Sequence, residues 1–154
     1  MGTTNFDAVV AAFVGALTGN VTGNVTGNVT GNVSGQITYP ATVARTATAD
    51  GTGTGTIAAA GLLQFVTVTS DDANKIIVLP APTPGTIVIL RNGATGYELR
   101  SSAPATVAIN GGSGAGAESA IAASTLVIAI CTTATTWQAI GLAGTTLAAV
   151  EAAA

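Results

Sequence analysis

The stretch LLQFVTVTSDDANKIIVLPAPTPGTIVILRNG, residues 62–93, decides the fold. It contains three runs rich in Val, Ile and Leu, at 62–69, 75–80 and 86–93, separated by Asp-Asp-Ala-Asn and by Pro-Ala-Pro-Thr-Pro-Gly. Short β-branched runs between turn clusters of this kind predict β-strands. In IIVL and TIVIL the apolar residues do not alternate with polar ones. This pattern indicates burial on both faces, by the core on one side and by a neighbouring subunit on the other.

The same pattern continues towards the C-terminus. Further apolar runs occupy 96–102, 106–110, 119–133, which is long enough for two strands, and 136–142. We therefore expect an all-β protein whose C-terminal domain, 62–142, is a jelly-roll-like β-sandwich or barrel. About 80 residues make a marginal core, which favours association with other copies.

A four-residue repeat, TGNVTGNVTGNVTGNVSGQITYP, occupies residues 18–40. Because four is a multiple of the strand period of two, an extended chain places the β-branched residues and the glycines on one face. One such strand has too little apolar area to fold alone, whereas three copies around an axis could enclose it. We predict a homotrimeric stem with inward-facing Val21, Val25, Val29, Val33 and Ile37.

The repeat could instead be a flexible linker or a row of glycan acceptors. A linker does not need a β-branched residue in every unit, so we favour the ordered stem. Asn20, Asn24, Asn28 and Asn32 each stand in an N-x-[ST] sequon, but one repeated word produces all four. The N-terminus has no basic region before its apolar run, so we expect a leaderless protein made in the cytoplasm and no glycosylation.

The residues before the repeat, 1–17, are predicted to form a docking arm. Their apolar side chains recur at spacings of three and four, which fits a short amphipathic helix, although the valines and Gly15 also permit a strand. Two phenylalanines on a short arm indicate a segment that docks on a partner. The predicted contact residues are Phe6, Val9, Val10, Phe13, Val14 and Leu17.

Two polar or small-residue segments flank the predicted domain. Residues 41–61 are rich in Thr, Ala and Gly and are expected to form a partly extended connector. Residues 143–154 contain helix-forming residues and are expected to be a tail, either a short helix or a frayed end.

The composition argues against nucleic-acid binding, catalysis and metal binding. Only 7% of residues are charged, the net charge is −3 and there are four Lys and Arg residues, so nucleic acid is not expected as a partner. The chain has no His, which removes Ser-His and Cys-His catalysis and imidazole metal sites. Cys131 is the only cysteine, and its apolar neighbours indicate a buried side chain. We expect no enzyme activity, no cofactor, no metal and no membrane span.

A set of turn and strand motifs resembles a small β-domain found in structural proteins of tailed bacteriophages. The motifs cover about 62–142, roughly half the chain, and are Thr67–Asp72, Leu79-Pro80, Pro84-Gly85, Asn92-Gly93, Ile109-Asn110-Gly111 and Thr136-Trp137. The resemblance is to the capsid decoration family, also called cement or head-fibre proteins, which shares this domain with tail-fibre proteins. It implies a homotrimer attached to the virion by its N-terminal segment, without catalytic residues.

The resemblance implies a virion structural protein on the outer capsid surface, with the major capsid protein and further copies of itself as partners. The alternative is a short trimeric tail fibre or spike for host attachment. The absence of a long shaft, and only Trp137, Tyr39 and Tyr97 as candidates for sugar stacking, disfavour it. A distant alternative is an ice-binding protein, because 52–56 and 67–70 contain alternating threonines, although these runs are short and separate.

Overall fold

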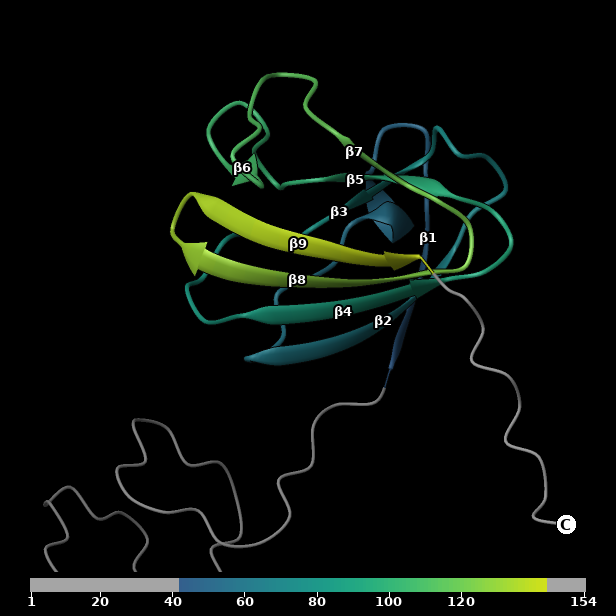
Figure 1. Cartoon of the computed structure of the whole chain (residues 1–154), viewed down its shortest axis with the longest axis horizontal. Helices are drawn as coiled ribbons and strands as arrows, with labels where there is room; N and C mark the ends of the chain where they lie inside the picture. Colours follow the sequence, from purple (N-terminus) through teal and green to yellow (C-terminus); the bar gives the residue numbers. More distant parts are fainter. Residues whose placement is uncertain (1–41, 144–154) are drawn as a thin grey trace, which may run out of the picture. The chain divides into compact units, whose positions relative to one another are not determined.

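The computed structural model describes residues 42–143, which form an all-β body with one short 3₁₀ turn (Figure 1). This confirms that the protein is all-β, as predicted. The elements are β1 Val43–Thr46, η1 Gly53–Gly55, β2 Leu63–Thr69, β3 Ile76–Val78, β4 Ile87–Asn92, β5 Tyr97–Arg100, β6 Ala108–Ile109, β7 Ser119–Ile121, β8 Thr125–Thr133 and β9 Thr136–Ala143.

Each predicted run contains a strand, because local pattern and turn chemistry agree along this part of the chain. The run at 119–133 forms two strands, β7 and β8. Ser124 has φ 54°, a left-handed conformation that ends the extended backbone between them. The side chain of Asn92 holds this break in place. Its amide nitrogen donates to the carbonyl oxygens of Thr95 and Ala122, and its oxygen accepts from the Thr125 N–H, all at 2.9 Å.

The strands form two sheets. Six strands make one sheet in the order β1-β2-β4-β8-β9-β6, and three make the other in the order β3-β5-β7. Figure 1 shows β2, β4, β8 and β9 side by side in one curved layer, with β3, β5 and β7 in the other. Buried side chains from both sheets belong to one hydrophobic core.

The N-terminal half of this body is solenoid-like. The chain passes from the larger sheet to the smaller and back, and β1, β2 and β4 are parallel neighbours, as are β3 and β5. Val43 pairs with Val66, and Val66 pairs with Leu90, so one coil takes about two dozen residues. Strands β7, β8 and β9 then run antiparallel to their neighbours β5, β4 and β8. The jelly-roll-like arrangement that we expected is not confirmed, because the first half of the body is built from parallel coils.

Residues 42–61, expected to be a connector, contribute to the folded body. Strand β1 extends the larger sheet, and the side chains of Ala47 and Ile57 are each only 2% exposed in the core. Gly51 makes the turn between them with φ +78°, and a Cβ there would lie 2.5 Å from Cγ2 of Val78. Only glycine therefore fits this position without a shift of its neighbours.

The two largest buried side chains are Trp137 on β9 and Tyr97 on β5. They are 0% and 1% exposed, and neither Nε1 of Trp137 nor the hydroxyl of Tyr97 has a hydrogen-bond partner among the described residues. Aliphatic residues from both sheets surround them, together with Cys131. The core is thus closed chiefly by packing, and polar contacts contribute little at its centre.

Candidate interaction surface

The outer side of the larger sheet carries large apolar side chains that are partly or largely exposed. Inward-facing residues such as Val66 and Val88 are buried, and the residues that alternate with them point the other way. We call these residues the outer apolar face: Leu63 and Phe65 on β2, Ile87 and Ile89 on β4, Leu126, Ile128 and Ile130 on β8, and Ile140 and Leu142 on β9.

Strand register arranges the outer apolar face in rows. Phe65 pairs with Ile89, Ile89 with Ile128, and Ile128 with Ile140, so one apolar row crosses four neighbouring strands. Leu63, Ile87 and Ile130 make a second row in the same way. Side chains in register on one face of a sheet pack against one another. The result is a continuous surface.

Exposure is greatest along β9. Ile140 is 60% exposed and Leu142 is 52% exposed, and Phe65 and Ile130 are more than one-third exposed. A soluble monomer rarely exposes a contiguous apolar patch of more than a few hundred Å², and larger patches mark interaction sites. The outer apolar face is therefore the strongest candidate for a binding surface in the described part of the chain.

The sequence pattern TIVIL had indicated burial on both faces of its strand. In β4 the side chains of Val88 and Leu90 are fully buried in the core, and Ile87 and Ile89 belong to the outer apolar face. The first half of that inference is confirmed. The neighbouring subunit on the outer side stays a prediction.

Arg91 is the only charged residue on the outer side of β2, β4, β8 and β9. It borders an open hollow of about 360 Å³ whose lining includes Phe65, Ile89 and Leu126. Among residues 42–143 the ion pairs are Lys75 with Asp71 and Arg100 with Glu118, and Arg91 takes part in neither. The surface is thus almost electrically neutral, with one cation at its border.

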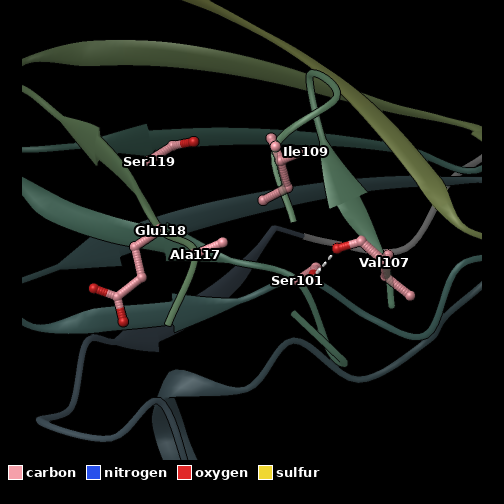
Figure 2. A pocket seen from close by; sticks show the side chains of 7 residues that line it. Ser101, Val107, Ile109, Ala117, Glu118 and Ser119 are labelled. Atoms are coloured by element: carbon pink, nitrogen blue, oxygen red, sulfur yellow. Dashed lines mark hydrogen bonds between the residues drawn. The ribbon is translucent and has the colours of Figure 1, made fainter. Parts of the chain in front are cut away.

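A small cavity lies elsewhere, between β5, β6 and the segment that leads into β7 (Figure 2). Its volume is about 50 Å³, far below the several hundred Å³ of typical ligand pockets. The Ser101 hydroxyl donates to the carbonyl oxygen of Val107 at 2.7 Å, and the carboxylate of Glu118 points away from Ile109 and pairs with Arg100. These polar groups already have partners, so the cavity offers room for water and little else.

The titratable groups with shifted pKa values have structural explanations. Asp71 pairs with Lys75 at 2.7 Å, and this contact lowers the pKa of the Asp71 carboxyl. Asp72 accepts a 2.9 Å hydrogen bond from the Asn74 N–H, which makes the turn predicted for Asp71-Asp72. Burial raises the pKa of the Cys131 thiol. No group of three or more potential metal-ligating side chains occurs among the residues with described positions.

The threonines of the TGTGT run do not form a flat array. They lie in and around η1, and each hydroxyl has a local acceptor: Asp50 for Thr52 at 2.8 Å, Thr46 for Thr54 at 3.2 Å and Gly51 for Thr56 at 2.8 Å. Thr67 and Thr69 are exposed on β2, but Thr67 pairs with Arg91 on the next strand. An ice-binding plane therefore gains no support from this geometry.

The residues predicted for the docking arm and the stem lie outside the described residues. This applies to Phe6, Val9, Val10, Phe13, Val14 and Leu17, and to Val21, Val25, Val29, Val33 and Ile37. Sequence reasoning assigned function to these segments and did not single out the outer apolar face by residue. The signal for it was present in the two-sided apolar runs, together with the alternation in LQFVTVT.

Within residues 42–143, no helix is long and apolar enough to cross a membrane. Comparison with known proteins found no matching protein family, no curated relative and no similar solved structure. The resemblance to phage decoration proteins therefore rests on the motifs in the sequence alone.

Proposed function

We propose that this protein is a structural component of a bacteriophage head, a capsid decoration protein that binds the outer capsid surface as a homotrimer. The sequence motifs carry the phage assignment, and the outer apolar face supports its assembly part, because it gives a small β-body a large surface for binding other protein subunits. The two sheets of this body share one hydrophobic core. Such a body suits the proposed role of a compact unit displayed on the capsid.

Energetics favour a role in assembly. Burying apolar surface is favourable by about 25 cal/mol per Å², so covering the exposed side chains of the outer apolar face would stabilise an assembly. Part of this is lost to the entropy of association. A protein that works alone in water would be expected to carry polar residues at Ile140 and Leu142, which are both more than half exposed.

In this proposal the arm, residues 1–17, attaches the protein to the capsid. Three arms on one trimer bind together, so weak individual contacts give high overall affinity. The major capsid protein is the proposed partner of Phe6 and Phe13 and of the aliphatic residues between them.

The tail-fibre alternative is less well supported. Sugar-binding surfaces commonly use exposed aromatic rings, and Tyr97 and Trp137 are buried in the core. Phe65 is the remaining aromatic residue within 42–143, and it lies on the outer apolar face. We therefore favour decoration of the head over host attachment.

The test is co-sedimentation of the purified full chain with empty heads of the phage that encodes it. The wild-type chain is expected to sediment with the heads, and a variant lacking residues 1–17 is expected to stay in the supernatant while keeping its oligomeric mass. Binding by the truncated variant would refute the arm as the attachment site. Absence of binding by the wild-type chain would refute the decoration function.

A further inference from the structure

We propose that the outer apolar face is buried against the same face of other copies of this chain. The inference deepens the proposed function and rests on it, because it names the surface that joins the copies of the proposed homotrimer. The stem was predicted to hold the copies together through residues 18–40. The outer apolar face extends that contact into the body.

The size of the surface fits another copy. A standard protein–protein interface buries about 800 Å² on each partner, and somewhat more than half of that area is apolar. The outer apolar face supplies nine large apolar side chains to such a side, two of them more than half exposed. In a trimer the same face of each copy can turn towards the threefold axis, so that each surface is shared between the two neighbouring copies.

The repeat and the C-terminal tail fit the surface less well, and in the proposed function residues 1–17 bind the capsid instead. Four strands and three rows of side chains, the third running from Arg91 through Leu126 to Leu142, span roughly 14 by 13 Å, whereas one extended segment covers a strip about 5 Å wide. In the repeat, one large apolar residue occurs in every four. After β9, residues 144–154 contain Leu147 and Val150 as their large apolar side chains. Neither segment can cover the central row from Phe65 to Ile140 and the rows beside it.

The low charge of the outer apolar face also favours a further copy of this chain as the partner. The outer apolar face has no carboxylate, and the one bordering cation is Arg91, so nothing on it selects a strongly charged partner. An equally uncharged surface leaves no charge unpaired over the two apolar rows, and Arg91 of each copy has to stay at the solvated edge of the contact. A further copy of this chain presents such a surface.

The first test is cross-linking through a single new thiol. Cys131 is the only native cysteine and is 1% exposed, so a cysteine placed elsewhere can be modified selectively. Ile140→Cys is expected to form a covalent dimer with a short bismaleimide in the full-length chain. Ala115→Cys, at an exposed position in the β6–β7 connection, is the matched control and is expected to be labelled without cross-linking.

Three results would overturn the inference. One is a wild-type chain that is monomeric by native mass spectrometry. Another is an Ile140→Cys chain that is labelled as freely as Ala115→Cys and is not cross-linked. The third is a thiol at position 140 that is protected in a monomer, which would assign the surface to another segment of the same chain.

The second test measures association. The double variant Ile140→Glu, Leu142→Glu changes two side chains that are more than half exposed, so the fold of one copy is expected to persist. Its subunit dissociation constant is expected to rise at least tenfold, and Ala115→Glu should leave it unchanged. A smaller rise in a folded double variant overturns the proposal. If the double variant does not fold, the cross-linking result decides.

Capsid binding separates this inference from the proposed function. A wild-type chain that cross-links at position 140 but does not bind heads would sustain the self-association surface and refute decoration. A chain that binds heads and does not cross-link would sustain decoration and refute the surface proposed here.

Discussion

The side chain of Asn110 hydrogen-bonds to the backbone of Ala139 as a neighbouring strand would. Nδ2 of Asn110 donates to the Ala139 carbonyl oxygen and the Ala139 N–H donates to Oδ1 of Asn110, both at 2.8 Å. Strand β6 ends at Ile109, so Asn110 continues its pairing with β9 by one step. Asn110 also has φ 52° and forms a two-residue Asn-Gly turn with Gly111, in which Ile109 and Gly112 exchange backbone hydrogen bonds.

This double role predicts the effect of Asn110→Gly. Glycine keeps the left-handed conformation of the turn and removes both side-chain hydrogen bonds to Ala139. The free energy of unfolding is expected to fall by about 1–3 kcal/mol, the net value of two hydrogen bonds. Urea unfolding followed by tryptophan fluorescence measures it through Trp137. An unchanged free energy of unfolding would show that the hydrogen bonds of the Asn110 side chain to β9 do not stabilise the fold.

Gly51 and Gly53 form a matched pair that separates backbone strain from crowding. Both have positive φ, but a Cβ at Gly51 would lie 2.5 Å from Val78, whereas a Cβ at Gly53 meets nothing within 4 Å. Gly53→Ala is expected to cost about 1–2 kcal/mol through strain alone. Gly51→Ala is expected to cost about 1–3 kcal/mol more because the core side chains must shift. Equal thermal unfolding midpoints for the two variants would contradict the crowding at Gly51.

Tyr97 predicts a change in stability at high pH. Burial raises the pKa of its hydroxyl, so the folded protein keeps the proton while the unfolded chain loses it near pH 10. The contribution of Tyr97 to the free energy of unfolding is therefore fully present below pH 10 and declines as the pH rises above 10. Tyr97→Phe should remove this part of the decline.

At neutral pH the same variant tests the unpaired hydroxyl. The Tyr97 oxygen has no described partner, so Tyr97→Phe is expected to raise the free energy of unfolding by about 1 kcal/mol. Paired urea titrations of wild type and variant at pH 7 and pH 11 check both statements. A loss of stability at pH 7 would mean that the hydroxyl has a hydrogen-bond partner in solution.

Cys131 is expected to be unreactive in the folded protein. It is 1% exposed and burial raises the pKa of its thiol, so both access and thiolate formation are suppressed. A thiol reagent such as DTNB should react fully in denaturant and at the rate of unfolding in buffer. Reaction in buffer at the rate of an exposed thiol would contradict the burial of Cys131 on β8.

Much of the local structure could be predicted from the sequence. Alternation in LQFVTVT and the turn clusters around KIIVLP indicated strands that the structure contains at Leu63–Thr69 and Ile76–Val78. These signals are short-range, because strand period and turn chemistry act within a few residues. Burial of Cys131 followed in the same way from its apolar neighbours.

Pairing and the first coil could not be predicted. Nothing within β2 specifies that Val66 pairs in parallel with Leu90, about two dozen residues later. The segment at 41–61 resembled a connector because its residues are small, yet Ala47 and Ile57 belong to the core. Small residues are needed in this segment because its backbone packs closely against its neighbours. Gly51 lies against β3, and Gly55 lies against β3 and the segment between β1 and η1. The outer apolar face, likewise, emerges only when register places residues from four strands in rows.

The antiparallel strands that complete the larger sheet come last in the chain, and this order bears on biosynthesis. β4 needs β8 as its second neighbour, and the core needs Trp137 from β9, so the body cannot close until about residue 143 has left the ribosome. The coils made earlier bring together residues far apart in sequence, which slows folding. We therefore expect the body to fold only once β9 has been made. Association of the copies would then follow folding, in a step whose rate depends on their concentration.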